Sequence, residues 1–197
     1  PLRAASVIFG KMSSKKIERS FGFLVAINTG LMNKGILGAT APGKNNRSAT
    51  MTTNPLHKLM NPASIATIGA GNNYLKMGTM HALSIIKDGY TGKFYPVHPK
   101  DETVLGHRAY RAVEDLPEAP DLALIVIPSE HVIPTIDSLG KLGTRYAIII
   151  TAGFKETGEK GKSMERELVE TARKYGMRFV GPNCMGIVNT AIALNTT

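Results

Sequence analysis

The chain has 197 residues and a formal net charge of +9, with 24 Lys or Arg against 15 Asp or Glu. This length suits one domain of ordinary size plus some additional sequence. Its single cysteine, Cys184, excludes an internal disulfide and fits a reducing compartment, so we predict a cytoplasmic protein. The longest apolar runs, 122–128 and 146–151, have strand lengths and fall far short of the roughly 20 residues that span a bilayer. We therefore expect no membrane partner.

Most of the positive charge lies in the first fifty residues. Residues 1–50 contain eight Lys or Arg and one acid, Glu18, whereas residues 51–197 contain sixteen bases and fourteen acids. The part with globular patterning is therefore nearly neutral. A basic surface for nucleic acid is not indicated, and we expect no nucleic-acid partner.

Residues 1–50 form an irregular basic N-terminal extension, because they show no hydrophobic period and are interrupted by Ala41-Pro42-Gly43. Three interpretations are open: a transit peptide, a disordered basic arm, or sequence upstream of the natural start. A transit peptide would make the protein organellar. The third interpretation puts the natural start at Met51, just ahead of the first clean pattern.

From Ser64 onward, short apolar segments alternate with amphipathic ones. The apolar segments predict strands at 64–68, 93–97, 122–127, 146–151 and 177–180, and the amphipathic ones predict helices at 78–87, 129–142 and 162–175. Such alternation predicts an α/β fold with a Rossmann-like, doubly wound parallel sheet of about five strands. The wholly apolar third segment is typical of a parallel strand that is buried on both faces.

Each predicted helix carries one apolar face. The expected inward residues are Met80, Leu83 and Ile86 in the first helix, Val132, Ile136 and Leu139 in the second, and Met164, Leu168 and Ala172 in the third. We expect Ser129 to cap the second helix and Pro134 to kink it.

Ligands of doubly wound sheets bind outside the carboxyl ends of the strands. The loop Gly69-Ala70-Gly71-Asn72-Asn73 follows the first strand, and a helix follows it. Glycines let a backbone approach a ligand, and a helix start offers N–H groups to a phosphate. The dinucleotide fingerprint asks for a third glycine where Tyr74 stands. The loop therefore predicts phosphate binding, with a tight turn that binds nothing as the alternative.

His98, Pro99 and Lys100 follow the second strand. An NAD site would place Asp or Glu here for the ribose hydroxyls. Lys100 can instead pair with a phosphate, which disfavours NAD and permits NADP or coenzyme A. A solvated loop lysine is the alternative interpretation.

The remaining strand ends contain small residues, prolines and an amide. Ile127-Pro128-Ser129 offers an apolar surface for a base or a pantetheine chain, although Pro and Ser are also common at helix starts. Thr151-Ala152-Gly153 and Asn183-Cys184 end the last two strands. Cys184 has no local His or acid motif, and the five histidines lack metal-ligand spacing. We therefore predict no catalytic residue and no metal site.

Several segments follow one another in a characteristic order: Leu59 to Ala70 (LMNPASIATIGA), Lys76 to Gly78 (KMG), Gly92 to Lys100 (GKFYPVHPK), Glu114 to Pro117 (EDLP) before Pro120 to Ala123 (PDLA), Thr151 to Glu156 (TAGFKE) and Gly181 to Gly186 (GPNCMG). In this order they resemble the opening domain of ADP-forming acyl-CoA synthetases and, more distantly, the α-subunit of succinyl-CoA synthetase. The resemblance covers about residues 55–190. It implies that the domain 51–190 binds coenzyme A or acyl-CoA.

The resemblance also implies roles by motif position. Gly69, Ala70, Gly71, Asn72 and Lys76 would meet the coenzyme phosphates, and Lys100, in the same loop as His98, would lie near the adenosine end. Ile127, Pro128 and Ser129 would line the adenine or pantetheine path, and Thr151, Ala152, Gly153, Asn183 and Cys184 would lie near the thiol and acyl end. Two residues depart from the pattern: Gly71 stands where Ser is frequent, and His98 stands where Asn is usual.

In the family, acyl-CoA and phosphate give an acyl phosphate, a histidine takes the phosphoryl group, and ADP receives it. The resemblance implies that this histidine, and the ATP-grasp domain or subunit that binds ATP, ADP and Mg²⁺, lie outside these residues. Residues 191–197 would begin the second domain, and the chain alone would be inactive as an acid–CoA ligase. Two alternatives are a stand-alone CoA- or nucleotide-binding regulatory module and an NADP-dependent oxidoreductase domain. The acyl substrate and assembly into an oligomer are left open.

Overall fold

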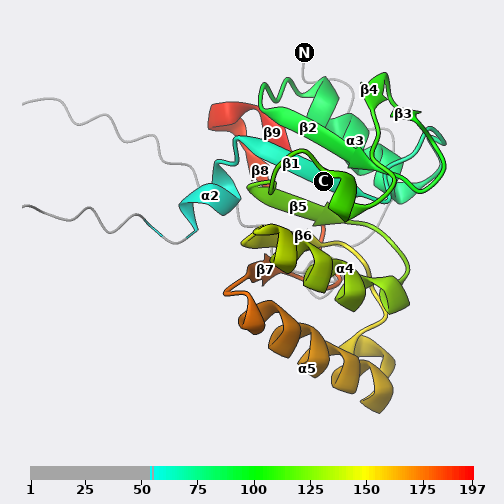
Figure 1. The fold of residues 1–197 in the computed structure, drawn as a ribbon, viewed down its shortest axis with the longest axis vertical. Helices are drawn as coiled ribbons and strands as arrows, with labels where there is room; N and C mark the ends of the chain where they lie inside the picture. Colours follow the sequence, from blue (N-terminus) through cyan, green and yellow to red (C-terminus); the bar gives the residue numbers. More distant parts are fainter. Residues whose placement is uncertain (1–53, 55) are drawn as a thin grey trace, which may run out of the picture.

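The computed structural model describes residue 54 and residues 56–197, and these form an α/β fold (Figure 1). The extension 1–50 and the expected start at Met51 lie outside the described residues. Five parallel strands form one sheet in the order β2-β1-β5-β6-β7. They are β1 (Ser64–Ile68), β2 (Lys93–Val97), β5 (Leu122–Ile125), β6 (Tyr146–Ile149) and β7 (Arg178–Val180). The predicted Rossmann-like parallel sheet is confirmed.

Helices and short hairpins complete the described part. The helices are α2 (His57–Met60), α3 (Met77–Lys87), α4 (Ser129–Leu142) and α5 (Glu159–Lys174). One hairpin pairs β3 (Thr103–Val104) with β4 (His107–Arg108), and another pairs β8 (Val188–Asn189) with β9 (Leu194–Asn195). Single 3-10 turns lie at η1 (Val113–Asp115), η2 (Lys155–Thr157) and η3 (Thr190–Ile192).

The sheet is covered on both faces, and β5 shows how the sequence achieves this. Its side chains alternate, so Leu122 and Leu124 pack in one cluster with Ile85 of α3, while Ala123 and Ile125 pack in the other with α4 and α5. All four residues are fully buried. An unbroken apolar run is therefore what a central parallel strand needs.

The predicted inward face of α3 is wrong by about one residue. The buried residues are Gly78, Thr79, His81, Ala82 and Ile85, whereas Met80 is 58% exposed. The reason is the close approach of the helix to the loop after β1, where a Cβ on Gly78 would overlap the Gly69 carbonyl oxygen. Small side chains must face this loop, and Met80 is therefore turned outward while Ile85 remains buried further along the helix.

The second predicted helix matches α4 from end to end, with Val132, Ile136 and Leu139 buried as expected. The expected cap is wrong, because Pro128 holds the N-cap position, Ser129 is the first helical residue, and no side chain caps the helix. Pro134 lies inside α4, which continues to Leu142. In α5, Leu168 and Ala172 are buried and Met164 is partly buried.

The last residues of the chain pack against α3. Leu194 of β9 is 1% exposed and shares a cluster with Ile65 and Ile85. His81 Nδ1 lies 2.7 Å from the carbonyl oxygen of Thr196. Burial lowers the pKa of His81, so at neutral pH the neutral ring donates to this carbonyl. This contact joins the β8–β9 hairpin to the helix that borders the candidate site.

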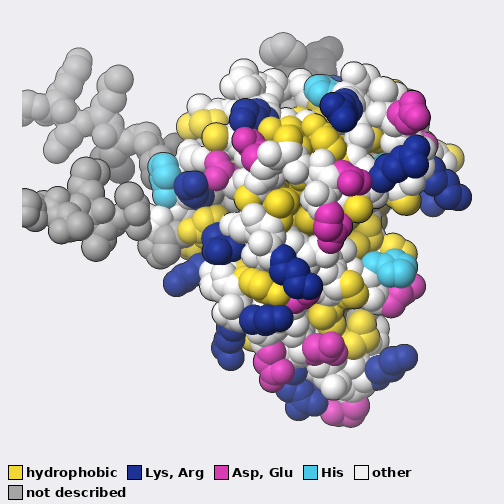
Figure 2. All heavy atoms as spheres, viewed as in Figure 1, with side chains coloured by type: hydrophobic (Ala, Val, Ile, Leu, Met, Phe, Trp, Pro, Cys, Tyr) yellow, Lys and Arg dark blue, Asp and Glu magenta, His cyan; other side chains and the backbone are white. Residues whose placement is uncertain are grey.

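Both basic and acidic side chains occur over the face seen in Figure 2. This agrees with the sixteen bases and fourteen acids of residues 51–197. No helix among the described residues combines the length and the apolar character needed to cross a membrane.

Candidate functional site

A cavity of about 940 Å³ opens at the carboxyl edge of the sheet, between the loops that follow β1 and β5. The strand order explains its position. The chain leaves β1, forms α3 and adds β2 on one side, and then returns to add β5 on the other side of β1. The loops after β1 and β5 therefore diverge, which leaves the crevice in which ligands of such sheets bind.

Two glycines shape the wall formed by the β1 loop. Gly69 has φ +96°, and a Cβ there would overlap the carbonyl oxygen of Val126. Gly78 would collide with Gly69 itself if it carried a side chain. The fold therefore requires glycine at both positions, whatever the ligand.

Gly71 differs from these two glycines. Its φ lies outside the left-handed region, and a Cβ would lie no closer than 3.5 Å to its nearest neighbour, His98 Nε2. Its N–H donates to Thr79 Oγ1 at 3.3 Å. Neither backbone nor packing requires glycine here, so the lack of a side chain enlarges the cavity.

Asn72 holds the rim of this wall together. Its amide nitrogen donates to the Thr103 carbonyl at 2.8 Å and to Asp101 Oδ2 at 3.2 Å, and its amide oxygen accepts from the Leu105 N–H at 3.0 Å. These bonds use both ends of the side chain. Asn72 therefore anchors the β3–β4 hairpin beside the cavity.

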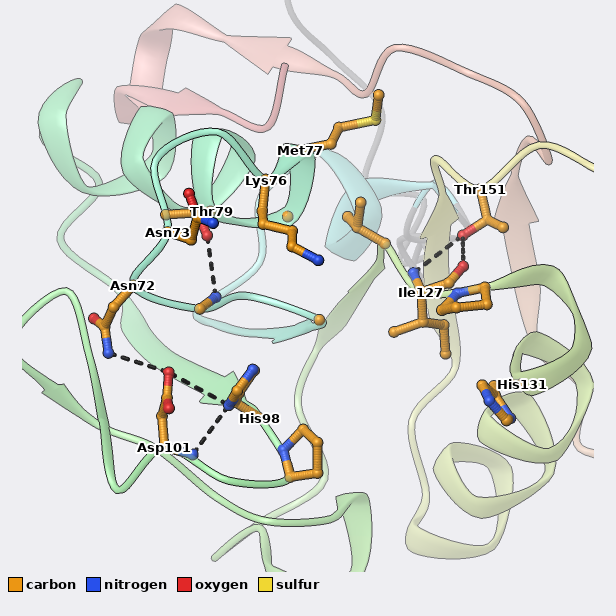
Figure 3. Close-up of a pocket in the computed structure, with 16 residues that line it drawn as sticks. Asn72, Asn73, Lys76, Met77, Thr79, His98, Asp101, Ile127, His131 and Thr151 are labelled. Carbon is orange, nitrogen blue, oxygen red and sulfur yellow. Dashed lines mark hydrogen bonds and ion pairs between the residues drawn. The ribbon is translucent and has the colours of Figure 1, made fainter.

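The start of α3 gives this wall its positive character. Lys76 holds the N-cap position, and no acid lies in the first turn of the helix. Its ammonium group points toward the open space between the two walls (Figure 3). The partial positive charge of a helix N-terminus favours an anion, and Lys76 adds a full charge beside it.

The opposite wall is largely apolar. Ile127, at the end of the β5 loop, and His131, from the first turn of α4, line the cavity on this side (Figure 3). Pro128 lines it beside them. Thr151 Oγ1 donates to the Ile127 carbonyl at 2.7 Å and accepts from the Ile127 N–H at 3.3 Å. The threonine thus fixes this wall and satisfies the hydrogen bonds of the Ile127 backbone, so the apolar side chains of Ile127 and Pro128 dominate the wall.

Thr151 lies in the loop after β6, and the loop after β7 packs beside it. The Glu156 carboxylate accepts from the Gly153 N–H at 2.6 Å, and this bond lowers the pKa of the carboxyl group. The Asn183 N–H donates to the Thr151 carbonyl at 3.0 Å. Cys184 Sγ donates to the Ile149 carbonyl at 3.3 Å, and burial raises the pKa of the thiol. A raised pKa keeps the thiol in its protonated form, whereas the thiolate is the nucleophilic form.

The structure brings about half of the predicted site residues into the cavity wall: Gly69, Gly71, Asn72, Lys76, His98, Ile127, Pro128 and Thr151. The others lie outside the lining. Ala70 is buried against Ala82 and Val104, and Lys100 is exposed in the loop after β2. Ser129 lies against Gly153, and Ala152, Gly153, Asn183 and Cys184 belong to the two neighbouring strand-end loops.

Eight lining residues were not among the predicted ones: Asn73, Met77, Gly78, Thr79, Pro99, Asp101, Val126 and His131. A simple signal could have found most of them, because they lie in the loop after a strand or in the first turn of the next helix. Asp101 also lies in the loop after β2, one residue beyond the predicted His98-Pro99-Lys100. It reaches the wall because its backbone N–H and carboxylate turn back to His98.

Known proteins match this chain over the part that carries the cavity. A family model described as CoA binding domain matches residues 63–190. The chain is 48% identical over 142 residues to the α subunit of acetate–CoA ligase (ADP-forming) II from Pyrococcus furiosus, covering 72% of this chain and 31% of that relative. It is 43% identical over 141 residues to 4-hydroxybutyrate–CoA ligase (ADP-forming) from Nitrosopumilus maritimus, covering 71% and 19%.

A solved structure agrees with these matches. The dinucleotide-forming acetyl-coenzyme A synthetase 1 of Ca. Korarchaeum cryptofilum, in complex with phosphate and ADP, has a TM-score of 0.70 and 39% sequence identity, covering 72% of this chain and 30% of that chain. The chain thus spans about a third or less of the length of these relatives. The family match extends over more than half of the 197 residues, and the chain belongs to the CoA-binding domain family.

Proposed function

We propose that this chain is the coenzyme A-binding part of an ADP-forming acid–CoA ligase. One observation carries the proposal: a single cavity at the sheet's switch point joins a positive wall, with Lys76 and the start of α3, to an apolar wall at Ile127 and Pro128. A ligand with phosphates at one end and a long, weakly polar chain at the other suits both walls. Coenzyme A has this composition, and the relatives named as ADP-forming CoA ligases support the choice.

The coenzyme would lie along the predicted residues. Its phosphates would meet the loop Gly69 to Asn72 and Lys76, and its adenosine end would lie toward Lys100. Its pantetheine chain would follow Ile127, Pro128 and Ser129 toward the loops 151–153 and 183–184, which would take the thiol and acyl end. The open space at Gly71, which a Cβ would partly fill, is consistent with a bulky phosphate on this wall.

The remaining chemistry would need other parts of the enzyme. We propose that phosphate displaces coenzyme A from acyl-CoA to give an acyl phosphate and free coenzyme A. A histidine outside this chain would take the phosphoryl group, releasing the acid, and pass it to ADP to give ATP. An ATP-grasp domain or subunit would bind the ADP, ATP and Mg²⁺. Residues 51–190 would then form the coenzyme-binding domain of a cytoplasmic enzyme, and 191–197 would lead to the next domain.

Coenzyme A is expected to bind this chain at least tenfold more tightly than NAD or NADP. Asp101 brings an acid to the cavity wall, but its Oδ2 lies 3.4 Å from His98 Nδ1 and 3.2 Å from Asn72 Nδ2, so it is engaged within the protein. A ribose diol therefore lacks the free carboxylate that an NAD site offers. Isothermal titration of the purified 197-residue chain with the three ligands tests this. Equal or tighter binding of NAD or NADP would reject the proposed function.

Replacing Lys100 with alanine is expected to weaken coenzyme A binding by about 1–3 kcal/mol, the range for a charge-assisted hydrogen bond. The loss should shrink with dephospho-coenzyme A, which lacks the ribose phosphate, and at high salt, because Lys100 is exposed. Titration of both forms at two salt concentrations measures this, with circular dichroism to verify folding. An equal loss of affinity for coenzyme A and dephospho-coenzyme A would show that Lys100 does not contact the ribose phosphate.

A further inference from the structure

The ring of His98 is held in one orientation by its own loop. The Asp101 N–H donates to His98 Nδ1 at 3.0 Å, so Nδ1 must be the acceptor nitrogen of the neutral ring. The Asp101 carboxylate lies 3.4 Å from the same nitrogen and is itself bound by Asn72 at 3.2 Å. The proton of the neutral ring therefore sits on Nε2, which is a hydrogen-bond donor.

This donor faces the cavity because residue 71 has no side chain. His98 lines the cavity, and its ring extends from Asp101 toward Lys76 (Figure 3). A Cβ on Gly71 would lie 3.5 Å from His98 Nε2 and 3.6 Å from Cδ2, so any side chain there would cover the edge of the ring that carries the proton. The fold does not require glycine at position 71. The effect of the glycine is instead to leave the Nε2–H of His98 uncovered in the cavity.

We propose that His98, uncovered by Gly71, donates its Nε2–H to the diphosphate of the bound coenzyme at the start of α3. The inference rests on the proposed coenzyme A function and adds a specificity-determining residue to that site. The diphosphate is favoured over the ribose phosphate, because Nε2 lies beside Gly71 and turns toward Lys76, whereas Lys100 lies outside the lining. The histidine thereby supplies a donor where a side chain at position 71 would otherwise be needed.

The two positions are therefore coupled, and a set of four variants of the 197-residue chain tests the coupling. His98→Asn should weaken coenzyme A binding about 10- to 100-fold, as expected for a lost bond to a charged group. Gly71→Ala should weaken binding at least about fivefold with a melting temperature close to wild type, because the added methyl group covers Nε2. The double variant Gly71→Ser, His98→Asn should bind within about threefold of wild type, because the serine hydroxyl replaces the missing donor. His57→Asn, on α2 away from the cavity, should bind like wild type.

Comparing two ligands identifies the phosphate group that His98 contacts. The loss caused by His98→Asn should be the same for coenzyme A and dephospho-coenzyme A, since both keep the diphosphate. A loss confined to coenzyme A would assign His98 to the ribose phosphate and overturn the inference. Wild-type affinity in His98→Asn would also overturn it while leaving the proposed function intact. Failure of the wild-type chain to bind coenzyme A would remove both.

Nuclear magnetic resonance distinguishes a direct contact with the ligand from a purely structural role of His98, because only a direct contact shifts the Nε2 signal when coenzyme A binds. Long-range ¹H–¹⁵N spectra of the free protein should show the Nε2–H form for His98, and added coenzyme A should shift Nε2 and the ³¹P signals of the diphosphate. The shift of the diphosphate signals should be smaller in Gly71→Ala. The Nδ1–H form in the free protein, or an unshifted Nε2 in the complex, would contradict the inference.

Discussion

Replacing Gly69 with alanine is expected to lower the free energy of unfolding by about 2–6 kcal/mol, the largest effect expected of a single methyl group in the β1 loop. The backbone there has φ +96°, which costs of order 1–3 kcal/mol for a residue with a side chain. The added Cβ would also overlap the Val126 carbonyl oxygen, and overpacking typically costs about 1–3 kcal/mol. Urea denaturation followed by circular dichroism measures the change.

Gly71→Ala is the matched control, because it adds the same methyl group two residues further along the same loop. Its backbone is compatible with alanine and its new contacts are ordinary, so unfolding should change by less than about 1 kcal/mol. A loss at position 71 as large as that at position 69 would show that both glycines are structural. The comparison therefore separates a glycine that the fold requires from one that the cavity requires.

Replacing Ile85 with alanine is expected to cost about 2–5 kcal/mol of stability, as is typical for a large-to-small substitution in a core. Ile85 is fully buried and packs with Leu122 and Leu124 beneath the sheet. Met80→Ala, on the same helix, should change stability by no more than about 0.5 kcal/mol, because Met80 is 58% exposed. The melting temperature and the urea midpoint of the two variants test this. A costly Met80→Ala with a mild Ile85→Ala would mean that α3 presents the other face to the core.

Ile85→Ala should also weaken ligand binding indirectly. The cavity wall rests on α3, whose first turn holds Met77, Gly78 and Thr79 in the lining. A looser helix would hold these residues less well, so coenzyme A affinity should fall in step with stability. Met80→Ala should leave the affinity close to wild type.

The strands could be predicted almost completely, because a buried parallel strand needs an unbroken apolar run and few other elements have one. β1 and β2 begin and end where predicted, whereas β5 and β6 end two residues earlier than the runs 122–127 and 146–151 suggest. The apolar residues beyond the strand ends belong to loops, and two of them, Val126 and Ile127, line the cavity. Hydrophobicity alone does not distinguish a strand residue from an apolar ligand wall.

The general location of the candidate site was also predictable from the sequence. Once strands alternate with helices, the carboxyl ends of the strands must share one edge, and ligands of such sheets bind there. That rule points to Gly69, Gly71, His98 and Pro128, which line one cavity. It points equally to Lys100 and Ala152, which do not. The edge of the sheet is a topological property, whereas membership of the wall depends on how each loop turns.

By itself, the sequence determined the sheet, its alternating helices and the edge that carries the strand-end loops, because each of these follows from periodicity along the chain. Only the tertiary structure decided which face of α3 is buried, since that depends on how closely Gly78 approaches Gly69. The role of Asp101 was decided in the same way. Its bond to His98 Nδ1 sets which nitrogen carries the proton, and Gly71 leaves that nitrogen uncovered. The contacts of Gly78 with Gly69 and of Gly71 with His98 join different segments of the chain, and the Asp101–His98 bond depends on how one loop turns. Packing and loop conformation, rather than periodicity along the chain, therefore determine these properties.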